Sequence, residues 1–299
     1  MSGATSAMKS ACVFSIDDAY VMPFQVFFHS LQTTKSIPTG TPIFILHTAS
    51  LSSHSIQGVE TFLFRYGRRA TFLDASHIIP ADLPIRPGDH VSPATFYRLF
   101  IAEILPPEID QAVYLDADML ALRSIADLFE LQVQALVAAA DQCNPCEGIR
   151  LWGERNGTYF NAGVLVIPVK IWRQQGLLQQ VLHILATERQ RIIWHDQDIL
   201  NITLADNWQR LPVWYNVDVA VVYALPGPMV EEHAALIHFS GKKKPWNALN
   251  PSPFTNNWDL AYEGLFGQRF DRRPFLPPLR LRLKAAIRSR LRGIVHSIL

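Results

Sequence analysis

The chain has 299 residues, of which 49% are hydrophobic and 18% charged; these proportions exclude a disordered polypeptide and allow one large α/β domain or two smaller ones. A net charge of +1 argues against a protein that coats nucleic acid, so no nucleic-acid partner is expected. The N-terminus has no apolar run of the length that a signal peptide or a membrane span needs, which favours a cytoplasmic location.

Short apolar segments alternate along the chain with segments of helical periodicity. In chain order, the predicted strands cover residues 11–16, 42–47, 70–74, 112–115, 135–140, 161–168 and 235–239. The predicted helices cover residues 24–31, 55–66, 95–103, 177–189 and 196–205, and a Pro-rich loop covers residues 80–93. This alternation predicts an α/β fold with a mostly parallel sheet and helices on both faces. Ligands of such folds bind beyond the carboxyl ends of the strands.

Two carboxylates separated by one residue follow the predicted strand 112–115. Side chains alternate along an extended backbone, so Asp116 and Asp118 are expected on the same side. Two hard oxygen ligands suit Mg²⁺ or Mn²⁺ better than zinc. A solvated turn or a helix N-cap is the alternative reading of any such pair, and Asp196 and Asp198 form a second one. Asp17 also lies at a predicted strand end, which favours a ligand site at this edge.

Six short segments occur in a consistent order over residues 11–250. They are residues 15–20 (SIDDAY), 97–99 (YRL), 114–118 (YLDAD), 160–164 (FNAGV), 195–198 (HDQD) and 238–241 (HFSG), the last followed by KPW at 244–246. This set resembles the retaining glycosyltransferases of family eight. That family includes bacterial lipopolysaccharide galactosyl- and glucosyltransferases and, more distantly, glycogenin.

The resemblance implies a GT-A fold, a UDP-hexose donor and Mn²⁺, with Mg²⁺ as the alternative ion. By position, Asp116, Ala117 and Asp118 match the family's D-x-D motif, and His238 matches its third protein ligand. The ion would bridge the two phosphates and act as a Lewis acid. Without the neighbouring motifs, His238 would be read as a core histidine at a strand end.

The resemblance also implies contacts to the nucleotide. Ser15, Asp17 and Tyr20 match positions that hold the uracil and the ribose, where a tyrosine ring can stack on the base. Ala19 departs from the family pattern, in which many members carry Asn. The alternative for Asp17 is a plain turn.

Two residues near the end of the matching region are expected at the diphosphate. Lys244 matches a lysine that contacts the phosphates, because an ammonium is a good point-charge partner for them. Gly241 would let the backbone approach the phosphates closely.

Five polar residues match the positions that hold the donor sugar in the family. They are Arg98, Asp141, Asn161, Asp196 and Gln197. Carboxylates and amides supply the paired donors and acceptors that a hexose needs, although Arg98 can instead be a structural salt-bridge partner. Gln197, Asp196 and Asp141 are the candidates for the catalytic step. An amide is a poor nucleophile, so we expect an oxocarbenium-like ion pair that Gln197 stabilises.

The C-terminal part of the chain has a different character. Residues 251–278 are rich in turn formers, and residues 279–299 place apolar side chains on one helical stripe surrounded by arginines. The sequence therefore predicts a catalytic domain over 1–250 and an extension over 251–299. A basic amphipathic helix at 279–299 favours contact with an anionic membrane surface, on the inner face of a membrane. A helix docked on the catalytic domain, or a disordered tail, is the alternative.

The sequence thus predicts a metal-dependent retaining hexosyltransferase. It would move galactose or glucose from a UDP-sugar to a glycan acceptor, such as lipopolysaccharide or another cell-surface glycan. A sugar-nucleotide pyrophosphorylase would need a Gly-rich loop after the first strand, and residues 15–20 contain no glycine. The non-enzymatic alternative is a nucleotide-sugar-binding protein without turnover.

Overall fold

The computed structural model describes residues 8–86, 91–141, 159–205, 207–220, 222, 227–247 and 252–272. The chain forms two compact units, residues 1–238 and residues 239–299. The basic amphipathic helix predicted over 279–299 lies outside the described residues. Within the described ranges, no helix has both the length and the apolar character needed to cross a membrane.

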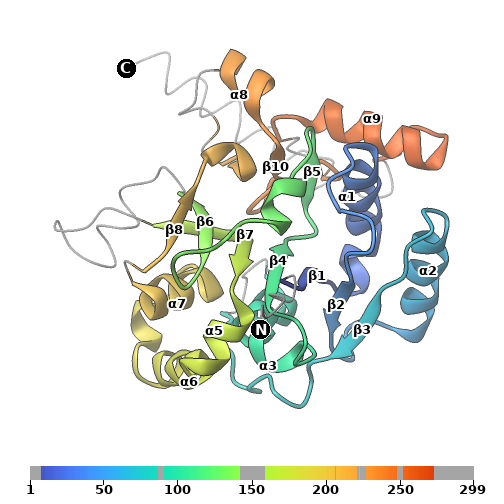
Figure 1. Ribbon diagram of the computed structural model, residues 1–299. Coiled ribbons are helices and arrows are strands. Elements are labelled where there is room, and N and C mark those ends of the chain that lie inside the picture. Colours follow the sequence, from blue (N-terminus) through green and yellow to red (C-terminus); the bar gives the residue numbers. More distant parts are fainter. Residues whose placement is uncertain are drawn as a thin grey trace, which may run out of the picture. The chain divides into compact units, whose positions relative to one another are not determined.

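A seven-stranded sheet forms the centre of the first unit, in the order β3-β2-β1-β4-β7-β6-β8 (Figure 1). The strands are β1 (Ser10–Ser15), β2 (Ile43–His47), β3 (Thr71–Asp74), β4 (Gln111–Leu115), β6 (Ala138–Asp141), β7 (Phe160–Ile167) and β8 (Gln209–Leu211). Neighbouring strands pair in parallel except at β7, which is antiparallel to both β4 and β6. The prediction of an α/β fold with a mostly parallel sheet is confirmed.

The reversed direction of β7 matters for the site. Because β7 runs against β4 and Val164 pairs with Leu115, the first residues of β7 extend past the end of β4. The Asp116 amide donates to the Gly163 carbonyl at 2.9 Å, so the two segments stay paired just past the strand end. Asn161, the second residue of β7, therefore lies at the edge of the sheet where Asp116 follows β4.

A three-stranded sheet, in the order β5-β10-β9, continues from this edge. It contains β5 (Met119–Ala121), β9 (Val217–Asp218) and β10 (Leu236–His238). β10 pairs antiparallel to β5 and parallel to β9, which sets His238 opposite Met119 and beside Asp218. β5 and β9, like β8, have only two or three residues and were not predicted.

Helices cover both faces of the large sheet, as predicted. Side chains of β1 alternate, so Phe14 packs edge-to-face on Phe24 of α1 (Val21–Thr33), and Phe24 packs on Phe62 of α2 (Ser53–Phe64). Val13 faces the opposite side, in a buried cluster that includes residues of α7 (His195–Leu204). The helices α3 (Ile101–Ile104), α5 (Val169–Gln174) and α6 (Leu177–Thr187) contribute to that same cluster.

Four helical segments of the structure differ from the prediction. Residues 93–100 form a 3-10 helix, η2 (Pro93–Phe100), before the single α-helical turn of α3, where one α-helix over 95–103 was predicted. The helices α5 and α8 (Gly227–His233) were not predicted. In the second unit, α9 (Thr255–Phe266) occupies a segment that was expected to be turn-rich; its Trp258 stacks on Tyr262 one turn later.

Candidate functional site

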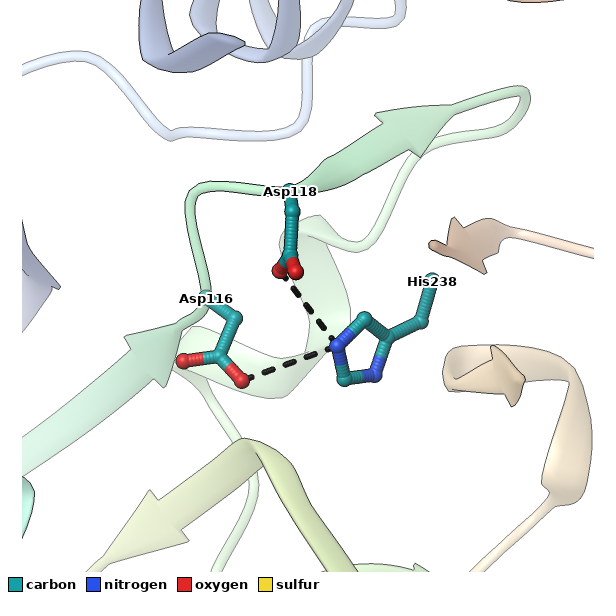
Figure 2. Close-up of side chains that lie close together, drawn as sticks. All are labelled: Asp116, Asp118 and His238. Carbon is teal, nitrogen blue, oxygen red and sulfur yellow. Dashed lines mark ion pairs between the residues drawn. The ribbon is translucent and has the colours of Figure 1, made fainter. Parts of the chain in front are cut away.

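Two carboxylates and an imidazole lie together beyond the end of β4. Asp116 follows β4, Asp118 precedes β5, and His238 ends β10. One ligand atom from each lies within 4.8 Å of the other two. The Nε2 atom of His238 is 3.4 Å from Asp118 Oδ1 and 3.6 Å from Asp116 Oδ2 (Figure 2). The structure thus brings together the three residues predicted as metal ligands.

The reason for this convergence differs from the predicted one. Residues 116–118 form a bend between β4 and β5, not a continuous strand. Figure 2 shows the chain turning between Asp116 and Asp118, with both carboxylates directed at the ring of His238. The backbone of Ala117 makes the turn, and its side chain is 4% exposed.

Arg98, near the end of η2, holds Asp116 with two hydrogen bonds. Its Nη2 donates to Oδ1 at 2.6 Å and its Nη1 to Oδ2 at 3.1 Å. The Tyr114 hydroxyl also donates to Oδ1, at 2.9 Å. A carboxylate oxygen has two lone pairs, so Oδ1 is fully used whereas Oδ2 keeps one. The free lone pair belongs to the oxygen that lies nearer His238.

A second carboxylate balances the same guanidinium. Asp196, in the first turn of α7, has Oδ2 at 3.0 Å from Arg98 Nε. Both side chains are about 5% exposed. Burial raises the pKa of the Asp196 carboxyl, and the charge of Arg98 opposes this, so that the pKa is about 6. The salt-bridge alternative for Arg98 is therefore what the structure contains, and a contact to the donor sugar stays a prediction.

The imidazole of His238 is held from its other side by an amide. Its Nδ1 lies 3.0 Å from Oδ1 of Asn216, so Nε2 is the atom that faces the carboxylates. Burial lowers the pKa of His238, but the charges of Asp118 and Asp116 outweigh this effect and raise it above its ordinary value.

Gly163 leaves the space that the His238 ring occupies. A Cβ atom at position 163 would lie 2.4 Å from Cε1 and 2.7 Å from Nδ1 of His238, and 2.9 Å from Cε of Met119. These distances are far inside van der Waals contact. The glycine was part of a matching segment in the sequence, but its role is spatial and no sequence pattern revealed it.

Asn161 lies in a buried network beneath the imidazole. Its Oδ1 accepts from the Gly163 amide at 2.8 Å and from Nδ2 of Asn216 at 2.9 Å. Its Nδ2 donates to Asp218 Oδ2 at 3.4 Å. Asn216 and Asp218 were missed by the sequence analysis, because they lie on a loop and a two-residue strand without a motif. The donor-sugar role of Asn161 stays a prediction.

The start of α7 is fixed to the start of β7. Gln197 accepts from the Ala162 amide at 3.1 Å and donates to the Tyr159 hydroxyl at 3.1 Å. Asp198 is fully buried, and its Oδ2 accepts from the amides of residues 193 and 194. The two aspartates of the second D-x-D therefore have different roles: Asp196 pairs with Arg98, whereas Asp198 fixes the turn before the helix. The catalytic role of Gln197 stays a prediction.

The residues predicted to hold the nucleotide lie at the end of β1. Ser15 is the last residue of that strand. Asp17 accepts from the amides of Ala19 and Tyr20 at 3.0 and 3.2 Å, which makes it the N-cap of η1 (Asp18–Tyr20). Burial raises the pKa of the Tyr20 phenol, and the negative charges of Asp118, Asp116 and Asp17 raise it further. Tyr20 therefore lies within the field of the acidic cluster.

Three predicted site residues have a more limited description. Asp141 is the last residue of β6, but its side chain is outside the described part of the structure. Gly241 and Lys244 belong to the second unit. Gly241 has φ +66°, a left-handed backbone that favours glycine. Lys244 donates from Nζ to the Phe239 carbonyl at 2.7 Å. Their roles at a diphosphate stay predictions.

Comparison with known proteins gives a consistent picture. The family described as "Glycosyl transferase family 8" matches residues 11–250. General stress protein A of Bacillus subtilis is 28% identical over 57% of this chain, and glycosyltransferase GlyF of Streptococcus pneumoniae is 29% identical over 88% of it. The chain spans 65% of the length of each. Lipopolysaccharide 1,2-glucosyltransferase of Escherichia coli is 30% identical over 58% of this chain and 54% of its own length.

Solved structures show the same fold. The galactosyltransferase LgtC, in a crystal structure with donor and acceptor sugar analogues, superposes with a TM-score of 0.73 at 22% identity. That likeness covers 89% of this chain and 100% of LgtC. GlyE of Streptococcus pneumoniae superposes with a TM-score of 0.64 at 23% identity, over 85% of this chain and 61% of GlyE. The fold is GT-A, as the family resemblance implied.

Proposed function

Because the chain belongs to glycosyl transferase family 8, we propose that it is a metal-dependent retaining hexosyltransferase that moves galactose or glucose from a UDP-sugar to a glycan acceptor. The observation that carries the proposal is the cluster of Asp116, Asp118 and His238 beyond the end of β4. This edge of a mostly parallel sheet is where α/β folds bind their ligands.

The ligand set fits a hard divalent ion. Octahedral ligands about 2.1 Å from an ion lie about 3 Å from each other, and Nε2 of His238 lies 3.4 and 3.6 Å from the two carboxylate oxygens. A small movement of the three side chains would bring their three ligand atoms onto one ion and leave its other positions for the phosphates. Asp116 would bind through Oδ2 alone, because Arg98 and Tyr114 occupy Oδ1. One imidazole with two carboxylates suits Mn²⁺, with Mg²⁺ as the alternative.

When bound, such an ion supplies a Lewis acid for the two phosphates of UDP. The chain's own residues would do the rest. Ser15, Asp17 and Tyr20 would hold the nucleoside at the end of β1. Gly241 and Lys244 would contact the diphosphate; the support for these two is the family match over residues 11–250.

The donor sugar would lie against the polar residues at the starts of α7 and β7. Arg98 is already paired with Asp116 and Asp196, so it would act mainly by fixing those two carboxylates. We propose that Asn161, Asp196 and, at the end of β6, Asp141 orient the sugar. Gln197 would lie nearest the anomeric carbon and stabilise an oxocarbenium-like ion pair through its amide oxygen. This role suits an amide, because an amide is a poor nucleophile.

The acceptor proposal rests on the relatives. Two similar proteins are named as lipopolysaccharide glycosyltransferases, one 1,2-glucosyl and one 1,3-galactosyl. We propose a lipopolysaccharide or another cell-surface glycan as acceptor. The basic stripe at 279–299 supports a further proposal, that the protein meets such an acceptor at the inner face of an anionic membrane. Co-sedimentation with vesicles of anionic and of neutral lipid, for chains with and without residues 279–299, would test it.

The experiment that tests the enzyme is UDP release from UDP-galactose and from UDP-glucose, each with Mn²⁺ and with EDTA. We expect slow hydrolysis of one donor by the wild type, and none with EDTA or in the Asp118→Asn variant. Asp82→Asn is the matched control, because Asp82 is exposed and its partner is Arg189, remote in sequence from the acidic cluster. The faster donor identifies the sugar.

The two alternative functions predict different results in this UDP-release assay. A nucleotide-sugar-binding protein without turnover would bind UDP in the presence of Mn²⁺ but release none from either donor, even with lipopolysaccharide acceptors added. A pyrophosphorylase would instead form UTP from a UDP-sugar and pyrophosphate. Turnover that persists in EDTA would contradict the proposed role of the acidic cluster.

A further inference from the structure

One buried amide touches the proposed metal site without being a ligand in it. Asn216 lies between η5 (Val213–Tyr215) and β9, and is 3% exposed. Its Oδ1 is 3.0 Å from Nδ1 of His238, and its Nδ2 is 2.9 Å from Oδ1 of Asn161. It therefore connects the imidazole to the start of β7.

The orientation of this amide follows from a backbone group that can only donate. The Gly163 N–H donates to Asn161 Oδ1 at 2.8 Å, so this side-chain atom of Asn161 is the acceptor. Asn216 must then present its NH₂ group to Asn161 and its carbonyl oxygen to His238. An oxygen accepts and cannot donate, so the proton of a neutral His238 ring lies on Nδ1. The lone pair of Nε2 is left facing Asp116 and Asp118 (Figure 2).

The carboxylates alone would favour the opposite tautomer. They lie 3.4 and 3.6 Å from Nε2, and both are acceptors that a proton on Nε2 would satisfy. A ring with its proton on Nε2 has no lone pair to offer an ion at that position. The network from Gly163 through Asn161 to Asn216 opposes this effect. Outer partners of ligating histidines act in this way in metal sites generally.

We propose that Asn216 is a positioning residue, which fixes the His238 imidazole in the Nδ1–H tautomer so that Nε2 is ready to bind the divalent ion. This inference rests on the proposed metal site. Asn216 is buried and belongs to a directional chain of three hydrogen bonds. An apolar side chain that only filled the same space could not set the tautomer of His238 in this way.

The first test needs no substitution in the network. Nitrogen-15 NMR of the ion-free protein, labelled at its ten histidines, distinguishes the two neutral tautomers, and His238→Gln identifies the resonances of residue 238. The reading is taken at a pH where titration of the same resonances shows a neutral ring. We expect the Nδ1–H pattern in the wild type. The Nε2–H pattern would overturn the proposal.

The second test compares Mn²⁺ binding among three variants. Binding is monitored through the electron paramagnetic resonance signal of free Mn²⁺. Asn216→Leu removes the acceptor, and we expect the Nε2–H pattern and Mn²⁺ affinity lower by about 10- to 100-fold. Asn216→Asp keeps an acceptor oxygen for His238 but loses the N–H that Asn216 donates to Asn161, so we expect the Nδ1–H pattern to return with only part of the affinity. Asn201→Leu is the control, because Asn201 is also buried and its amide bonds both the N–H and the C=O of Phe160.

The outcomes separate this proposal from the proposed function. If Asn201→Leu loses as much Mn²⁺ affinity as Asn216→Leu, the effect is structural and the positioning role is wrong. If Asn216→Leu keeps the Nδ1–H pattern, the role is also wrong, whatever the activity. A wild type that shows the Nδ1–H pattern but binds no Mn²⁺ would instead refute the metal site itself, and the positioning role with it.

Discussion

The substitution Gly163→Ala tests the geometry of the site with a single methyl group. A Cβ atom at this position would lie 2.4 Å from Cε1 of His238, whereas non-bonded carbon atoms approach to about 3.5 Å. One of the two groups must therefore move by about 1 Å. The third contact, with Cε of Met119, is easily relieved because the end of a methionine is flexible.

The His238 ring cannot move by that amount and remain a ligand. It is buried, it is bonded to Asn216 on one side, and metal–ligand distances tolerate only about ±0.2 Å. We expect Mn²⁺ affinity to fall by at least about 10- to 100-fold, the range seen when the support of a ligating histidine is lost. Overpacking should also lower the free energy of unfolding by about 1–3 kcal/mol.

The assay is a Mn²⁺ titration, with urea unfolding of the same samples. Gly58→Ala is the matched control, because Gly58 lies in α2, where an added Cβ meets nothing within 4 Å; alanine there should stabilise the helix by about 0.5–1 kcal/mol. Adding Met119→Ala to Gly163→Ala should not restore binding. Wild-type Mn²⁺ affinity in a folded Gly163→Ala variant would refute the reasoning.

Three further predictions concern the groups around Asp116. Tyr114→Phe removes one hydrogen bond to Oδ1 and should weaken Mn²⁺ binding by up to about 10-fold with the fold intact; a Mn²⁺ titration checks this, and unchanged binding contradicts it. Arg98→Met leaves the carboxylates of Asp116 and Asp196 buried without their partner, so the free energy of unfolding in urea should fall by about 3–5 kcal/mol, and a loss below about 1 kcal/mol would show that the pair contributes little. Burial raises the pKa of Asp196 from 3.8 to about 6, so its protonated form stabilises the fold fully below about pH 4, and this contribution is lost as the pH rises through 6. The stability of Asp196→Asn relative to the wild type should therefore increase between pH 4 and 6, and a difference that does not vary with pH would show that this carboxyl has an ordinary pKa.

Much of the framework was predictable, because the signals were local. Buried strands followed by Asp17 or Asp116 placed polar groups at one edge of a parallel sheet, and the structure has them there. The direction of β7 was not predictable, since an apolar run gives no indication of which way its strand pairs. Residues 93–100 have the buried side chains of a helix, but they form a 3-10 helix that periodicity does not distinguish from an α-helix.

The residues that hold the proposed metal ligands in place could not be predicted from the sequence, for a different reason. Arg98 bonds Asp116 across 18 residues, and Asn216 meets Asn161 across 55. Such contacts depend on how strands are ordered, not on spacing in the chain. Gly163 does not have the left-handed backbone that requires a glycine. What requires glycine there is space for the ring of His238, which lies at the other end of the first unit's sequence.

The central claim is that Asp116, Asp118 and His238 bind a divalent ion that in turn binds the diphosphate of UDP. The most direct measurement is the anomalous diffraction of crystals grown with Mn²⁺ and UDP. We expect one Mn²⁺ peak about 2 Å from Nε2 of His238 and from one oxygen of each aspartate, in contact with both phosphates. UDP bound at the end of β1 with no Mn²⁺ at these three side chains would contradict the account.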